Sequence, residues 1–125
     1  MDDEYTSLGT LMVLTHARLR DMLDDLRDGL PCLEFCSLLT EHHTDEDDNL
    51  FPRLAARHPE LRQFLDELRR DHQVIASMLP TVQDDPEALN GLTAVLETHF
   101  TGEEKRLTTL LNDLRRDELG RDENR

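Results

Sequence analysis

The sequence predicts an all-α protein, an up-down-up-down antiparallel four-helix bundle, from three observations. Apolar residues recur at intervals of three and four, the spacing of one face of an α-helix. Only 4% of the residues are aromatic and 34% are charged, a composition typical of Leu-packed helices with ion pairs on their surfaces. A helix stop followed by Pro occurs at three places and divides the chain into four helical segments.

The three breaks are Gly29–Pro31, His58–Pro59 and Asp84–Pro86. Pro suits the first turn of a helix, where its missing N–H has no partner in any case. The helices between the breaks are expected to be roughly 22 to 30 residues long, and their connections are only a few residues long, so that consecutive helices must run in opposite directions.

Each segment carries its own apolar stripe. The first two stripes are Leu8, Leu11, Met12, Leu19, Met22, Leu23 and Leu26, and then Leu33, Leu38, Leu39, Leu50 and Leu54. The last two are Leu61, Phe64, Leu65, Leu68, Ile75 and Leu79, and then Leu89, Leu92, Val95, Leu96, Leu107, Leu110, Leu111 and Leu114. Pro52 lies inside the second segment and is expected to kink or locally break that helix, because Pro cannot donate a backbone hydrogen bond.

The length of 125 residues fits one domain, residues 1–125, with an ordered core at about 7–115. The charged tail after Leu114 is expected to be a frayed helix end or disordered. Two cysteines, Cys32 and Cys36, have neither the CxxC spacing of a redox motif nor that of a zinc pair, and are expected to be small core residues.

The charge balance excludes two classes of partner. There are 14 Lys and Arg against 28 Asp and Glu, which gives a formal net charge of −14 at pH 7. A chain this acidic repels the phosphates of nucleic acids and anionic lipids. The longest uncharged run, residues 5–15, is too short to span a bilayer, and a soluble, cytoplasmic protein is expected.

Histidines and carboxylates interrupt the apolar stripes at one height. In an antiparallel bundle, residues equally far from a turn lie at the same level. His16 is 14 residues before Leu30 and His42 is 12 after it; Glu46 is 12 before His58 and His72 is 14 after it; His72 is 13 before Asp85 and His99 is 14 after it. At a rise of about 1.5 Å per residue these mismatches are about 2 to 3 Å.

Spacing along the helices supports a metal site at this level. His42 with Glu46, and His99 with Glu103, are i, i+4 pairs that project from one face. Imidazole with carboxylate suits iron, manganese or zinc, whereas calcium requires oxygen ligands. A single interior His is more often hydrogen-bonded in a core, but burying four imidazoles and two carboxylates without partners would cost several kcal/mol each.

These residues resemble a haemerythrin-like, or HHE cation-binding, domain over residues 7 to about 115. The resemblance rests on His16 in LTHARL, on HHTDEDDNLFP at 42–52, on His72 in RRDHQVI and on HFTGEE at 99–104. It implies a pair of iron ions with an oxo or hydroxo bridge, zinc or manganese being less expected. Carried over by position, His16 and His42 bind one iron, His72 and His99 bind the other, and Glu46 and Glu103 bridge the two.

The chain departs from the pattern of the oxygen-carrying relatives at one position. Those proteins have a further His one turn after the third-helix ligand, where this chain has Ala76. His43 is expected either to supply the missing ligand, to support a ligand through a hydrogen bond, or to lie at the surface. Phe51 and Phe100 are expected to line the pocket and keep water out.

Ala76 leaves one coordination position of the implied metal centre without a protein ligand. An open position favours a centre that reacts with dioxygen or hydrogen peroxide, and so removes peroxide or oxidises a small substrate. The alternative is a module that binds, senses or stores oxygen, nitric oxide or iron without turnover. A third interpretation is a helical interaction protein with a zinc or vestigial site. The protein is expected to be a monomer or a homodimer, with Leu50-Phe51 on the kinked second helix as a dimer face.

Overall fold

The computed structural model describes residues 8–82 and 84–123, the segment 115–123 by its backbone only. The described residues contain helices and turns and no strand. The helices are α1 (Leu8–Arg27), α2 (Leu33–Asp45), the π-helix η2 (Glu46–Leu50), α3 (Phe51–Arg57), the 3-10 helix η3 (Pro59–Leu61), α4 (Arg62–Met78), the 3-10 helix η4 (Leu79–Thr81) and α5 (Pro86–Glu123). The all-α prediction is confirmed.

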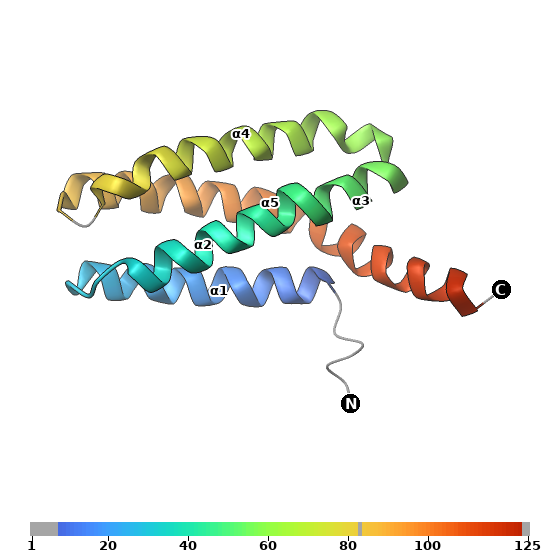
Figure 1. Cartoon of the computed structure of the whole chain (residues 1–125), viewed down its shortest axis with the longest axis horizontal. Helices are drawn as coiled ribbons and strands as arrows, with labels where there is room; N and C mark the ends of the chain where they lie inside the picture. The colour runs from blue at the N-terminus through green and yellow to red at the C-terminus, as the bar shows by residue number, and fades with distance from the viewer. Residues whose placement is uncertain (1–7, 83, 124–125) are drawn as a thin grey trace.

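The helices lie side by side along the long axis of the molecule (Figure 1). Helix α5 contacts α1, α3 and α4, and α1 also contacts α2. This arrangement is consistent with a four-helix bundle. The three predicted breaks are confirmed as the places where helices end, and at the first of them Gly29 has a φ of +92°, a conformation that Gly adopts without strain.

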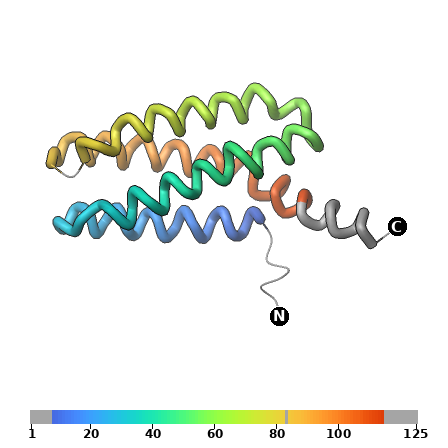
Figure 2. The backbone as a smooth tube through the Cα atoms, viewed as in Figure 1, coloured from blue at the N-terminus to red at the C-terminus, as the bar shows by residue number. Residues whose placement is uncertain are grey.

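The second segment follows one continuous path from α2 through η2 into α3 (Figure 2), but its α-helical hydrogen bonding is interrupted at Glu46–Leu50, directly before Pro52. The predicted local break is present as one widened turn. The Phe51 N–H donates to the carbonyl of Glu46, five residues back, and Pro52 lies in the first turn of α3. Widened turns of this kind are rare in helices and often occur at functional sites. Here the turn begins at a residue predicted to bind metal.

The apolar core is split into two clusters. The first is Met12, Leu50, Phe51, Leu54, Leu61, Leu65, Leu68, Leu107, Leu111 and Leu114. The second is Leu19, Leu23, Phe35, Leu39, Ile75, Val82, Leu89, Leu92, Leu96 and Phe100. Along each helix, the candidate ligands fall between members of the two clusters, as His16 does between Met12 and Leu19.

Several apolar residues depart from the expected positions. Leu11 and Leu33 of the predicted stripes are exposed. Leu50 and Phe51 are buried in the first cluster, so the prediction that they form a dimer face is wrong, because the helix turns them inward. None of the helices in the described part of the chain combines the length and the apolar character needed to cross a membrane.

Gly9 is expected to be required at the close contact between α1 and α5. Its N–H donates to Asn112 Oδ1 at 2.8 Å, and a Cβ at this position would collide with the carbonyl oxygen of Thr108. Gly9→Ala should therefore lower the free energy of unfolding by about 1–3 kcal/mol, measured by urea denaturation. Gly91→Ala is the control, because the nearest atom to its Cβ would be Met78 Cε at 3.7 Å. Equal stability of the two variants would contradict the prediction.

Candidate metal centre

The six predicted ligands lie together between the two apolar clusters. His16 comes from α1, His42 from α2, Glu46 from η2, His72 from α4, and His99 and Glu103 from α5. Five of them are buried, and the His42 side chain is only 10% exposed. His43, for which the sequence left three roles open, is also buried among them.

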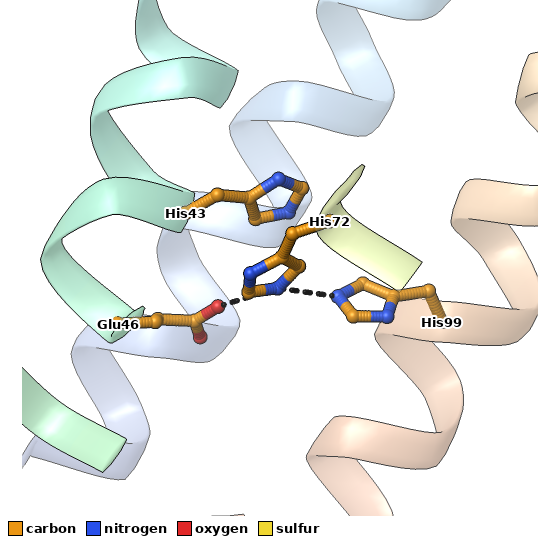
Figure 3. A group of neighbouring side chains, drawn as sticks. All are labelled: His43, Glu46, His72 and His99. Atoms are coloured by element: carbon orange, nitrogen blue, oxygen red, sulfur yellow. Dashed lines mark hydrogen bonds and ion pairs between the residues drawn. The ribbon is translucent and has the colours of Figure 1, made fainter. Parts of the chain in front are cut away.

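The side chains form two groups that share Glu46. One group is His16, His42, Glu46 and Glu103, and the other is His43, Glu46, His72 and His99; within each, the donor atoms lie within 4.8 Å of one another. Figure 3 shows the second group, with the three imidazole rings and the Glu46 carboxylate converging from different helices. Glu46 faces both groups, with Oε2 at 3.4 Å from His42 Nε2 and Oε1 at 3.3 Å from His72 Nε2.

Three of the imidazoles are held by carboxylates on their outer side. His16 Nδ1 donates to Glu104 Oε2 at 2.7 Å, His72 Nδ1 to Asp47 Oδ1 at 2.9 Å, and His99 Nδ1 to Asp71 Oδ2 at 3.1 Å. A carboxylate can only accept, so the hydrogen of each neutral ring is on Nδ1. The Nε2 atoms of these rings therefore carry lone pairs.

The inward Nε2 atoms lie in two facing pairs. His72 Nε2 lies 3.1 Å from His99 Nε2, and His16 Nε2 lies 3.1 Å from His42 Nε2. When the hydrogens of His72 and His99 are on Nδ1, neither Nε2 can donate to the other. A cation between such lone pairs would turn a repulsive contact into ligation, and an outer carboxylate on each ring is the arrangement that orients imidazole ligands in metal proteins.

The two glutamates also lack hydrogen-bond donors. All four carboxylate oxygens of Glu46 and Glu103, together with His43 Nε2, are buried without a hydrogen-bond partner among the described residues. Unpartnered buried carboxylates are costly. Burial, with the nearby Glu103 carboxylate, raises the pKa of Glu46 well above its usual value. Burial also acts to raise the pKa of Glu103, but the interactions with His16, Glu46 and His99 outweigh burial and lower that pKa to about 2.

Burial favours the neutral form of three of the imidazoles. It lowers the pKa of His42 to about 4 and that of His72 to about 3, and it also lowers the pKa of His43, with neighbouring imidazoles adding to the effect in each case. Neutral imidazole is the form that binds metal. The donor set, the facing lone pairs and the unpartnered carboxylates together fit a pair of metal cations.

Phe100 and Phe51 pack on the faces of candidate ligands. Phe100 stacks on His16 with ring centroids 4.1 Å apart, and Phe51 lies 5.8 Å from His72 at 22° between ring planes. Both are 1% exposed or less. Both rings therefore cover one face of a candidate ligand inside the bundle.

His43 stacks on the imidazole ring of His72 in the second group. Its centroid lies 3.7 Å from that of His72, with 10° between the planes. It therefore does not lie at the surface, which removes one of its three expected roles.

A short internal repeat, which was not among the predictions from the sequence, connects these features. Residues 42–47 read HHTDED and residues 99–104 read HFTGEE. In each copy the acid after the glutamate holds a His from another helix: Asp47 holds His72, and Glu104 holds His16. The orienting roles of Asp47, Glu104 and Asp71 were not predicted, but the repeat signals the first two. Residue 43 in the first copy corresponds to Phe100 in the second.

A crevice of about 200 Å³ between α2 and α4 reaches the second group. It is lined by His43, His72 and Asp47 and includes Ala76 near its exposed side. Ala76 stands at the position where the oxygen-carrying relatives have a further His. The small side chain here borders open space instead of an imidazole.

The fold and this polar layer define a helical metal-binding module. The sequence model of one family, described as the Hemerythrin HHE cation binding domain, matches residues 8–111. The chain belongs to that family, which confirms the resemblance seen in its histidine motifs. Comparisons with curated proteins and with solved structures gave no match.

Proposed function

We propose that the chain is an up-down-up-down antiparallel bundle that binds two iron ions and reacts with dioxygen or hydrogen peroxide. The observation that carries the proposal is the set of buried imidazole lone pairs and carboxylate oxygens without donors. His16 and His42 would hold one ion, His72 and His99 the other, and Glu46 and Glu103 would bridge them. Glu46 suits bridging because it contacts a His of each group.

Iron in this layer would supply the redox steps that reduction of dioxygen or peroxide requires. The chain's own residues supply the remaining conditions. The outer carboxylates fix the imidazole orientations, and the apolar clusters above and below the layer exclude bulk water. The crevice beside Ala76 gives a small molecule a route to His72 and His43.

A second function, sensing or storage without turnover, is favoured by the origin of the ligands. They come from α1, α2, η2, α4 and α5, so that metal binding would stabilise the whole bundle at once. Loss of the metal or a change of its state would then change the stability of the fold, which a partner or a protease can detect.

Metal analysis of the purified protein, combined with its ultraviolet and visible spectrum before and after hydrogen peroxide, tests the proposal. About two irons per chain with repeated peroxide consumption would support an enzyme, since a free metal position is needed for turnover. A single stable spectral change without turnover would support a sensor or carrier. Failure to bind iron after anaerobic ferrous reconstitution would contradict both.

Removing an outer carboxylate should weaken metal binding. Glu104→Gln leaves His16 without its anionic acceptor and is expected to reduce metal affinity by about 10–100-fold, measured by competition with a chelator. Glu97→Gln is the matched control, because Glu97 also pairs with Arg20, whereas the carboxylate that holds His16 Nδ1 is that of Glu104. Equal affinity in the two variants would argue against the orienting role of Glu104.

We propose that His43 is the donor that replaces the His absent at position 76. In the wild type, the Phe100 ring stacks on His16, and the His43 ring stacks on His72. His43→Phe replaces the imidazole by a phenyl ring that can keep the stack on His72. The variant is expected to fold and to lose about one metal ion per chain, measured by metal analysis, because the second group loses one of its four donors. Unchanged metal content would show that His43 supports the site without binding metal.

A further inference from the structure

Cys32 and Cys36 lie close together at the start of α2, apart from the metal centre. Cys32 is the N-cap residue of α2, and Cys36 follows one helical turn later. The Cys36 thiol donates a hydrogen bond to Cys32 Sγ, with 3.2 Å between the sulfur atoms, and the Cys36 N–H donates to the Cys32 carbonyl at 2.8 Å. Both residues are partly exposed. The prediction that they are core residues holds only in part: Cys36 packs against the second apolar cluster, whereas Cys32 is half-buried where α2 begins at the end of the bundle.

We propose that Cys32 and Cys36 form a reversible intramolecular disulfide by exchange with a low-molecular-weight disulfide. The sulfur atoms would move from 3.2 Å to about 2.0 Å, the length of the bond. The first turn of α2 must also tighten, because Cβ atoms one helical turn apart lie about 5–6 Å from each other and a disulfide requires about 3.5–4.5 Å. This site is independent of the function proposed for the metal centre.

The geometry gives the two thiols different roles. Cys32 is the N-cap residue of α2, and its sulfur accepts the hydrogen bond from the Cys36 thiol, so that the Cys36 proton lies between the two sulfur atoms. Only a thiolate attacks a disulfide. Burial, followed by the interaction with Cys32, raises the pKa of Cys36 to about 12. Cys32 is therefore the attacking thiol, and Cys36 is the thiol that resolves the intermediate.

The exchange balances in two steps. In the first, the Cys32 thiolate attacks one sulfur of the small disulfide, the disulfide bond breaks, and one small thiolate leaves and takes a proton from solvent. In the second, Cys36 gives up its proton and attacks Cys32 Sγ, which releases the second small thiol. The protein dithiol loses two hydrogens and two electrons, and the small disulfide is reduced to two thiols.

Oxidised glutathione, added to the chain of residues 1–125 as purified, tests the proposal. After an acid quench and alkylation, the wild type is expected to lose both alkylation sites and about 2 Da of mass, and to recover both after dithiothreitol. Peptide mapping should show one peptide that holds both cysteines in a disulfide. Retention of two alkylatable thiols at excess oxidised glutathione, or formation of a disulfide-linked dimer only, would overturn the proposal.

The two single variants test the order of the steps. Cys36→Ser should stop at a stable mixed disulfide with glutathione on Cys32, because the resolving thiol is absent. Cys32→Ser should react more slowly, by about tenfold or more at neutral pH, because the thiolate fraction of Cys36 is small. Faster adduct formation in Cys32→Ser than in Cys36→Ser would contradict the assignment of Cys32 as the attacking thiol.

Discussion

Glu46→Gln is expected to abolish binding of both metal ions and to stabilise the metal-free protein. Glu46 is the side chain that belongs to both donor groups, and the neutral amide cannot bridge two cations as a carboxylate does. Metal content should fall from about two ions per chain to less than one, since binding free energy depends on the charged ligands.

The expected stabilisation of the metal-free protein by Glu46→Gln has a separate cause. Burial makes ionised Glu46 costly, as its raised pKa indicates, and its oxygens have no donor among the described residues. The Gln amide is neutral and can donate to the lone pairs of His42 or His72, which lie 3.4 and 3.3 Å from the present oxygens. The free energy of unfolding without metal should rise by about 1–3 kcal/mol.

Urea denaturation of wild type and variant, each with metal and with chelator, measures both effects. Asp48→Asn is the control, because Asp48 is an exposed acid in the same turn, η2. Asp48→Asn should leave the metal content unchanged and should change the free energy of unfolding by no more than about 0.5 kcal/mol. A Glu46→Gln variant that is less stable than wild type in chelator would indicate a structural polar cluster instead of a metal site.

The metal-free protein is expected to lose several kcal/mol of stability between about pH 6.5 and pH 4. The unfolded chain has imidazole pKa values near 6.5, whereas burial lowers the folded values of His42 to about 4 and His72 to about 3. Below about pH 6.5 the unfolded chain therefore binds protons that the folded chain excludes, and stability falls as pH falls. The loss of stability is complete only below the pKa values that His42 and His72 have in the folded protein.

Other groups modify this dependence. The pKa of His43 is also lowered by burial, so it adds to the loss. The raised pKa of Glu46 acts in the opposite direction, because the folded state takes up that proton first. The raised pKa of Asp47 acts in the same direction as that of Glu46, whereas the lowered pKa of Glu103 adds to the loss as the pH falls below 4.5. Two carboxyls then oppose three imidazoles and Glu103, and the net loss remains.

Urea midpoints measured in chelator at a series of pH values, and repeated with iron, test the dependence. The metal-loaded protein should keep its stability to lower pH, because protons must first displace the metal from the imidazoles. His58→Asn is the control, since His58 lies at the turn after α3 and pairs with exposed Glu60. It should leave the pH dependence in place. A metal-free wild type with constant stability over this range would contradict the burial of neutral imidazoles.

Several features of the molecule follow from local chemistry and were predictable. The helix breaks depend on Gly and Pro, which act within one or two residues. The level of the candidate ligands follows from counting residues from each turn, because the rise per residue of a helix is fixed. The burial of His16, His72 and Glu46 follows from their places within apolar stripes.

Other features depend on how the helices are rotated against one another. Asp47 and Glu104 look like solvated acids in the sequence, and only the packing of η2 against α4 and of α5 against α1 brings them to His72 and His16. The Cys32–Cys36 contact similarly depends on where α2 begins at the end of the bundle.

The sequence by itself determined the helical class, the family and the level at which four histidines and two glutamates meet. Only the tertiary structure decided that Pro52 is accommodated by the widened turn at Glu46, that Leu50 and Phe51 turn inward, and that His43 stacks on His72. The physical reason is that helical periodicity fixes height and an approximate face, whereas the contacts of a side chain depend on the rotation of its helix and on its neighbours. That rotation is set jointly by all the packed helices.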